Sequence, residues 1–311
     1  MASDTSTSSP KLFAGTVIGG IYLSTDAGSS WTAVNNGLTN TGSSRDPVRN
    51  GLTNTVVLSL AASGMNLFPG VGDLAMDHGG VLLSTDNGVS WSTVNTGLPS
   101  STVVALAASS TNTPSPMLIA GADHNGIFIS TNNGANWTAI NTGLGSPYIK
   151  AIALSGANLF AGTSFSGVYM STNMGKNWIA VNTGLPLTAI NALAASGSNL
   201  FAATRKGVFH STNNGTSWSA VNTGLTNTSI RSLAVTSTNT SSPMLFAGNE
   251  GRGVFCSTNN GLSWTAVNAG LKRRNIYALV VSGTNLFAAT AEGGIWRRPL
   301  SELLGTTDSG R

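Results

Sequence analysis

Two Asp–His pairs carry side chains that could bind a metal ion. Asp77 and His78 precede one repeated strand, and Asp123 and His124 occupy the matching position in the neighbouring repeat unit. Carboxylate and imidazole groups are ligands for divalent transition metals. The spacing of the two pairs is not that of a local metal motif, so we interpret them as solvated loop residues. The sequence therefore predicts no metal site and no other cofactor.

A second chemistry to consider is glycoside hydrolysis, which needs two carboxyl groups that face one another across the scissile bond. Asp77, Asp123, Glu250 and Glu292 all fall in loops of one kind, yet the sequence singles out no pair among them. We therefore predict no catalytic residue and favour binding over catalysis, with glycoside hydrolysis as the alternative.

The same kind of loop carries further charged and aromatic residues that depart from the repeat. Some, such as Arg205, lie two residues before the glycine that opens a repeated strand, here Gly207. Others, such as Arg231, lie near the start of a different repeated strand. Varied side chains at equivalent positions of a rigid scaffold are typical of a binding surface, although loops without function also vary. The candidate ligand-binding residues are Asp77, His78, Asp123, His124, Lys150, Arg205, Arg231, Glu250, Tyr277 and Glu292.

A sequence repeat positions these residues. A segment of the form NLFAG…GVxxS begins seven times, at Leu12, Leu67, Leu118, Leu159, Leu200, Leu245 and Leu286. The first six copies are followed by a turn of the form S-T-[D/N]-x-G-x-[S/N]-W. A period of about 40 residues with four short strands in each unit is typical of a β-propeller.

One repeat unit predicts four strands, which we name A to D: Ile190–Ser196, Leu200–Thr204, Gly207–Thr212 and Trp218–Asn222. Strands B and C occur seven times, and strands A and D six times. The sequence therefore predicts an all-β, seven-bladed β-propeller of four-stranded antiparallel blades over residues 11–298, in which the first blade lacks strand A and the last lacks strand D. Residues 1–10 are expected to form part of an A–B loop or a tail, and residues 299–311 a C-terminal tail. In such a meander the B–C loops and the D–A linkers emerge on one face.

The turn between strands C and D has a composition with a local physical reason. Its Asp or Asn side chain can accept hydrogen bonds from turn amides, its Gly permits a positive φ, and its Trp is expected to pack between blades. Four of the six copies carry Asn rather than Asp, and this loss of charge argues for turn formation and against metal binding or catalysis. These structural residues are Asp26, Asp86, Asn132, Asn173, Asn213, Asn259, Trp31, Trp91, Trp137, Trp178, Trp218 and Trp264.

This turn resembles the Asp-box of BNR repeats, and the resemblance covers residues 11–298. That group includes sialidases, xyloglucan-active glycosidases, photosystem II assembly factors of the Ycf48 type, sortilin-like receptors and propeller lectins. The repeats also resemble those of secreted bacterial proteins. The resemblance implies a propeller and no single activity. Because the N-terminal region lacks the Arg-Ile-Pro motif of sialidases, a sialidase-like glycoside hydrolase is the second hypothesis.

Composition limits the classes of partner that the chain is expected to bind. Only 8% of the 311 residues are charged, the net charge is +4, and there is one cysteine. The basic cluster at Leu271–Asn275 lacks the interleaved aromatic residues of a nucleic-acid site. No apolar run approaches the roughly 18 residues of a membrane helix. We expect a noncatalytic propeller, secreted or on the cell surface, that binds a glycan in the manner of a lectin or a protein ligand, without nucleic acid or membrane insertion. A structural repeat within a larger chain or surface assembly is a third hypothesis.

Overall fold

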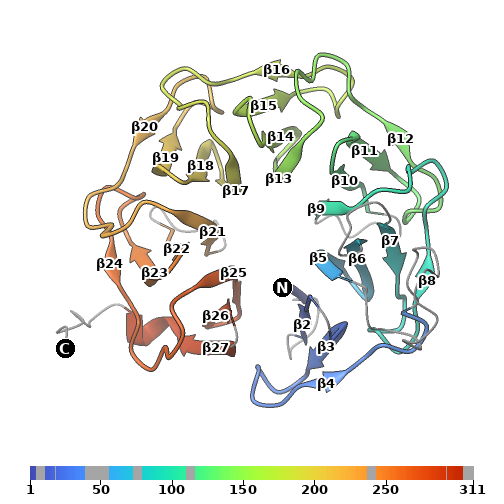
Figure 1. Cartoon of the computed structure of the whole chain (residues 1–311), viewed down its shortest axis with the longest axis horizontal. Coiled ribbons are helices and arrows are strands. Elements are labelled where there is room, and N and C mark those ends of the chain that lie inside the picture. The colour runs from blue at the N-terminus through green and yellow to red at the C-terminus, as the bar shows by residue number, and fades with distance from the viewer. Residues whose placement is uncertain are drawn as a thin grey trace. The chain divides into compact units, whose positions relative to one another are not determined.

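The computed structural model describes residues 1–4, 11–17, 19–38, 56–72, 79–109, 116–236, 243–291 and 293–303. These residues form seven antiparallel sheets, which are the blades of an all-β, seven-bladed propeller, as the repeat predicts (Figure 1). The chain divides into two compact units. Unit 1 contains residues 1–152 and 173–178, and unit 2 contains residues 153–172 and 179–311.

Unit 1 holds blades 1 to 3 and the start of β13. Blade 1 contains β1 (Ala2–Asp4), β2 (Lys11–Gly15), β3 (Ile21–Ser24) and β4 (Thr32–Ala33). Blade 2 contains β5 (Val56–Ser63), β6 (Asn66–Gly72), β7 (Gly79–Leu83) and β8 (Ser92–Thr93). Blade 3 contains β9 (Val103–Ala108), β10 (Leu118–Ala122), β11 (Gly126–Ser130) and β12 (Thr138–Ala139).

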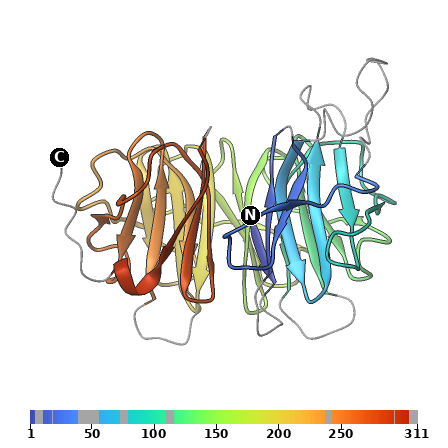
Figure 2. The same cartoon turned by 90° about the horizontal axis from the view of Figure 1, so that it is seen from below.

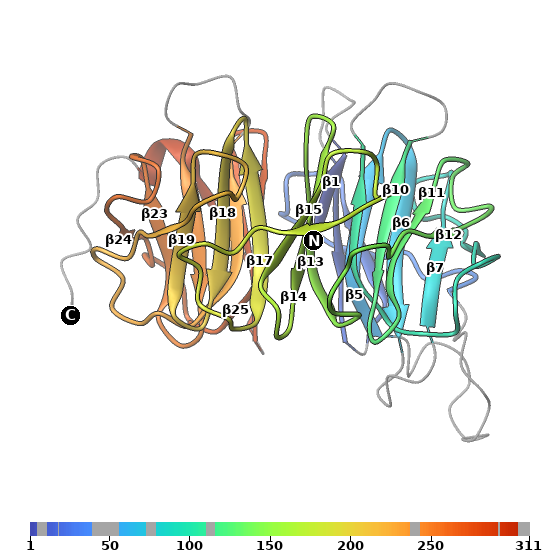
Figure 3. The same ribbon diagram turned by 90° about the horizontal axis from the view of Figure 1, so that it is seen from above.

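Unit 2 holds most of blade 4 and all of blades 5 to 7, whose strands run side by side in Figures 2 and 3. Blade 4 contains β13 (Ile149–Ser155), β14 (Asn158–Thr163), β15 (Val168–Ser171) and β16 (Ile179–Ala180). Blade 5 contains β17 (Ile190–Ser196), β18 (Asn199–Thr204), β19 (Gly207–Ser211) and β20 (Ser219–Ala220). Blade 6 contains β21 (Ile230–Val235), β22 (Leu245–Asn249), β23 (Gly253–Ser257) and β24 (Thr265–Ala266), and blade 7 contains β25 (Ile276–Ser282), β26 (Asn285–Thr290) and β27 (Gly294–Pro299).

The two ends of the repeat differ from each other. The last blade has three strands and lacks strand D, as predicted. In blade 1 the repeat supplies β2 to β4, and β1, from outside the repeat, pairs with β2. Part of the segment predicted as loop or tail is therefore a strand. The predicted C-terminal tail begins within β27 and continues as the 3₁₀ helix η1 (Leu300–Leu303), whose Leu303 is buried in the core of the last blades. The described part of the chain contains no helix long and apolar enough to cross a membrane.

Strand D is the element that the sequence predicted least well. The prediction placed it at Trp218–Asn222, whereas β20 covers only Ser219–Ala220. The backbone N–H of Trp218 donates to the carbonyl of Thr183 in the linker of the preceding blade, at 2.8 Å, and so leaves the ladder of its own blade. The repeated tryptophan thus ties two blades together at the position where strand D would otherwise begin.

The core consists of apolar layers between neighbouring blades, because both faces of strand B are buried. In β18, Leu200 and Ala202 pack in the layer shared with blade 4, and Phe201 and Ala203 pack in the layer shared with blade 6. Alternate side chains of a strand point to opposite faces, so one short apolar run serves two layers. Cys256 lies in the next layer, and burial raises the pKa of its thiol to about 12.

The C–D turns are held by the same local bonds whether the key residue is Asp or Asn. In the Asp86 turn, Ser84 Oγ donates to the carboxylate at 2.7 Å and the Ser90 amide donates to it at 2.9 Å. Ser90 Oγ also donates to the carboxylate, and this bond is the largest of the causes, ahead of those from Ser84 Oγ and the Ser90 amide, that lower the pKa of Asp86 to about 2. In blade 5 the amide of Ser217 donates to Asn213 Oδ1 at 2.9 Å, which is the equivalent bond without a charge. The turn therefore uses the side-chain oxygen and does not need the negative charge.

Five of the six turn tryptophans lie deep between blades. Trp218 is 5% exposed, and its Nε1 donates to the carbonyl of Val181 in blade 4 at 2.8 Å. Equivalent bonds to the preceding blade are made by Trp91, Trp137, Trp178 and Trp264. Trp31, the first copy, is only half-buried. The depth of the ring, rather than the turn sequence, therefore distinguishes the six copies.

Strand β19 carries His210, a partly buried histidine. His210 on β19 is stacked on Phe201 with ring centroids 4.5 Å apart, and its Nε2 lies 2.8 Å from Asn199 Oδ1. Burial lowers the pKa of His210 below its usual value of 6.5, because it penalises the charged ring. The unfolded chain then takes up this proton more readily than the folded one, so folding stability is full above about pH 6.5 and falls below it.

We therefore expect the urea midpoint to fall between pH 7.5 and pH 5.5, and to fall less in a His210→Met variant. Blade 4 carries Met170 at the equivalent position, so methionine fits this site. Urea unfolding followed by tryptophan fluorescence at both pH values measures the difference. Equal pH dependence in the two proteins would contradict the assignment to His210.

Candidate functional site

In unit 2 the B–C loops and the D–A linkers meet on one face of the blades. The linker between blades 5 and 6 reaches both neighbouring loops. Thr228 Oγ1 donates to the Arg205 carbonyl at 3.2 Å, and Asn227 Nδ2 donates to the Glu250 carbonyl at 3.2 Å. The linker between blades 6 and 7 also contacts both neighbouring loops. Its Asn275 carbonyl accepts from the Ala291 amide of blade 7 at 3.0 Å, and its Arg274 carbonyl accepts from the Gly251 amide of blade 6 at 3.2 Å. Each linker is thus fixed against two loops, which gives this face a rigid frame.

A bulge in strand A presents the candidate side chains on this face. In β21, Ile230 pairs with Asn249 but Ser232 pairs with the preceding residue Gly248, so Arg231 is the extra residue. The same register shift leaves Asn191 extra in β17 and Tyr277 extra in β25. A bulge bends the strand and redirects the side chain of the extra residue. The positions that the sequence singled out in strand A therefore share a structural cause.

Three candidate residues come together at blades 6 and 7. Arg231 Nη2 lies 3.2 Å from Glu250 Oε1, and the guanidinium carbon of Arg231 lies 4.7 Å from the centre of the Tyr277 ring. The side chains of Arg231 and Glu250 are 37% and 45% exposed, and Tyr277 is 56% exposed. Arg231 thus joins an acidic and an aromatic side chain that both face solvent. We call these three residues the Arg231 cluster.

The carboxylate of this cluster is held from the linker as well. Ser229 Oγ donates to Glu250 Oε2 at 3.0 Å, and the Glu250 amide donates to the Ser229 carbonyl at 3.0 Å. Beneath them Asn249 is fully buried and donates through Nδ2 to the Asn227 carbonyl at 2.5 Å. Asn227 and Ser229 give no sequence signal, because they lie in a linker of ordinary small polar residues. Asn249 gives a weak one, since it stands where other units carry Thr163, Thr204 and Thr290.

Another candidate, Arg205, and the bulge residue Asn191 lie in blade 5 and contact blade 6 without joining the cluster. Arg205 is exposed on the B–C loop of blade 5, where its carbonyl receives the bond from Thr228. Asn191, the bulge residue of blade 5, donates through Nδ2 to the Ile230 carbonyl at 2.8 Å. These two hydrogen bonds, each from a side chain to a backbone carbonyl, connect blades 5 and 6.

In unit 1 a second group forms around His124. His124 has a φ of +66° and places Nε2 3.4 Å from Asp123 Oδ2. Its ring meets that of Tyr148 edge to face, with centroids 4.6 Å apart. Lys150 is exposed at the start of the adjacent strand β13. The pair Asp123–His124 is therefore part of a small polar and aromatic group on the loops of blades 3 and 4.

Three predicted residues, Asp77, His78 and Glu292, lie outside the described residues. The matching of the two Asp–His pairs therefore stays a prediction. Within the described ranges, no group of three or more His, Cys, Asp and Glu side chains could hold a metal ion.

Comparison with known proteins supports the fold and leaves the activity open. Residues 148–290 match the DUF6242 beta propeller domain. No curated protein sequence matches the chain.

Solved structures are similar at low identity. A GH74 enzyme from Niastella koreensis is 20% identical, with a TM-score of 0.72 over 95% of this chain and 51% of its own. The GH74 xyloglucanase from Xanthomonas campestris is 15% identical, with a TM-score of 0.72 over 93% of this chain and 50% of its own. YCF48 bound to D1 peptide is 16% identical, with a TM-score of 0.66 over 91% of this chain and 86% of its own. The chain thus spans about half the length of the GH74 structures that it matches.

Proposed function

We propose that the chain is an extracellular propeller of the BNR/Asp-box class and a noncatalytic binding module whose ligand contacts the Arg231 cluster. The observation that carries this proposal is the exposure of a cation, a carboxylate and an aromatic ring on bulge and loop positions of a rigid frame. Charged side chains exposed to this extent contribute little to stability, so a stability role does not account for the arrangement. A preformed polar site binds with little loss of conformational entropy.

The ligand that we propose is a glycan. An aromatic ring with hydrogen-bonding groups around it matches a sugar, which has apolar C–H faces and polar hydroxyl groups. The GH74 neighbours include a xyloglucanase, whereas the YCF48 neighbour was solved with a peptide. A protein ligand is therefore the competing outcome of the test.

The contacts of the Glu250 carboxylate favour binding without catalysis. Arg231 engages one of its oxygens and Ser229 the other. In the described part of unit 2 the other acidic side chain is Glu302, which pairs with Arg298 beside η1. A glycosidase site needs a second carboxyl group across the bond from the first. The glycoside hydrolase alternative would therefore need a carboxyl group from outside the described part of unit 2.

The test is a glycan array probed with the wild-type chain, Arg231→Ala and Tyr277→Ala. We expect binding to a subset of glycans and a loss of about tenfold in affinity in each variant, which corresponds to about 1.4 kcal/mol. Leu58→Ala is the matched control, because Leu58 is an exposed bulge residue in unit 1. It should bind as the wild type does.

The alternative is tested on the glycans that bind. Release of reducing ends by the wild type, abolished by Glu250→Gln, would establish a glycosidase and overturn the noncatalytic proposal. Binding that both cluster variants retain in full would show that the ligand site lies elsewhere.

A further inference from the structure

The linker between blades 6 and 7 departs from all the other described linkers in one respect. Each of these linkers places four residues between a Leu and an Ile or Val. The four residues read PSST after Leu98, GSPY after Leu144, PLTA after Leu185 and TNTS after Leu225. After Leu271 they read KRRN. The scaffold is therefore the same, and three cations have replaced small polar or apolar residues.

The scaffold holds this basic segment in place. Leu271 and Ile276, which flank it, are 7% and 0% exposed. The carbonyl of Arg274 accepts bonds from the amides of Gly251, at 3.2 Å, and Gly253, at 2.9 Å. On the other side the Asn275 carbonyl accepts the bond from Ala291. The cations thus stand on a backbone that is fixed to the B–C loops of blades 6 and 7.

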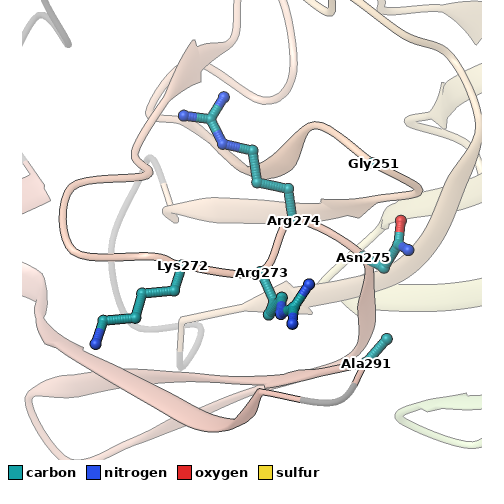
Figure 4. A pocket seen from close by; sticks show the side chains of 6 residues that line it. All are labelled: Gly251, Lys272, Arg273, Arg274, Asn275 and Ala291. Atoms are coloured by element: carbon teal, nitrogen blue, oxygen red, sulfur yellow. The ribbon is translucent and has the colours of Figure 1, made fainter. Parts of the chain in front are cut away.

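A pocket opens between this segment and the two loops. It has a volume of about 390 Å³ and is lined by Gly251, Lys272, Arg273, Arg274, Asn275 and Ala291 (Figure 4). This volume lies within the range of about 300–1,000 Å³ typical of small-molecule sites. Gly293 keeps the wall open for Arg273, since a Cβ at this position would come within 2.7 Å of Arg273 Cγ.

The three cations of the pocket have no acidic partner in the part of the chain that the structure describes. Glu250, which precedes the lining residue Gly251, is engaged by Arg231 and Ser229. Lys272, Arg273 and Arg274 are all exposed to solvent. Three like charges on adjacent residues give this segment a positive potential that attracts an anion, and the three side chains extend in different directions from it (Figure 4). Arginine also binds a carboxylate or sulfate through two parallel hydrogen bonds.

We propose that this pocket binds the anionic group of an acidic sugar, a carboxylate or a sulfate, and so selects acidic glycans over neutral ones. The inference rests on the proposed function and adds the class of ligand to it. Asn275 lines the pocket, and Tyr277 of the Arg231 cluster follows it by two residues at the start of β25. One acidic oligosaccharide can therefore place its charged group in the pocket and a neighbouring ring near Tyr277.

The experiment is isothermal titration of the whole chain with three probes: a galacturonate oligomer, the same oligomer as its methyl ester, and a heparin hexasaccharide. The ester removes the charge from the same sugars, and heparin adds sulfate. The variant is Arg273→Gln, and the matched control is Lys176→Gln, which removes one positive charge from an exposed turn in unit 1. Thermal unfolding checks that both variants fold.

We expect at least one acidic probe to bind about tenfold more tightly than the neutral ester. Arg273→Gln should remove this advantage, and Lys176→Gln should retain it. Preference for galacturonate or for heparin then identifies the group as carboxylate or sulfate. Equal affinity of Arg273→Gln and wild type for the acidic probes would overturn the inference. The inference would also be overturned if the wild type bound neither galacturonate nor heparin.

The failures of the two proposals are distinguishable. If the ester binds as tightly as the acid and Arg231→Ala abolishes both, the Arg231 cluster is the site and the anion pocket is wrong. If acidic probes depend on Arg273 but not on Arg231 or Tyr277, the pocket stands and the role of the cluster in the proposed function is wrong.

Discussion

Replacing Trp218 with alanine is expected to lower the free energy of unfolding by about 3–5 kcal/mol. The ring is 5% exposed and belongs to the apolar layer between blades 4 and 5. Its loss leaves a cavity and removes the partner of the Val181 carbonyl, which accepts from Nε1 at 2.8 Å. A buried carbonyl without a partner adds its own cost. Urea unfolding followed by circular dichroism measures the change.

The chain supplies a matched control in the first copy of the same turn. Trp31 occupies the equivalent position in blade 1 but is only half-buried. Trp31→Ala should therefore cost less than half as much as Trp218→Ala. Similar losses in the two variants would mean that burial between blades is not the source of the stabilisation. Glycan binding by Trp218→Ala at a temperature where it remains folded should match the wild type, because Trp218 lies in the scaffold.

The fold was predictable because its signal is repeated. Each NLFAG segment is apolar on both faces, and this pattern alone requires a neighbour on each side of the blade. The seven-bladed propeller is confirmed, and strand A of blade 5 has the bounds that the sequence predicts. Features that depend on other parts of the chain were not predictable. β1 belongs to no repeat, and the short strand D depends on the bond from Trp218 to another blade.

The positions of the candidate site residues were predictable from the sequence, but the contacts between these residues were not. Alignment of the repeats placed Arg231 and Tyr277 at equivalent points, but it gave no reason for their exposure. That reason is the register shift in strand A, which depends on pairing with strand B. Ser229 and Asn227 could not be predicted from the sequence, because their roles depend on which loop the linker contacts. The basic linker had a visible signal, namely KRRN in place of uncharged residues, but only the structure shows that it borders a pocket.

The linkers also contain the position at which a small substitution should have the second largest effect on stability. Gly184 has a φ of +84°, and a Cβ there would overlap the backbone carbonyl oxygen of Trp218. A side chain at this position therefore meets two penalties, which are the left-handed backbone and a clash with backbone that cannot move aside. We expect Gly184→Ala to cost about 4 kcal/mol of unfolding free energy.

Gly197, in the A–B turn of blade 5, separates the two penalties. Its φ is +60°, and nothing lies within 4 Å of a Cβ built on it. Gly197→Ala should therefore pay for the backbone conformation alone, about 1 kcal/mol. Urea unfolding under identical conditions measures the free energy of unfolding of both variants. The difference between the two values gives the contribution of the close approach between Gly184 and the Trp218 carbonyl. If Gly184→Ala were no more destabilising than Gly197→Ala, the linker would not be held against Trp218 in solution. The frame on which both proposed sites depend would then be looser than the backbone bonds indicate.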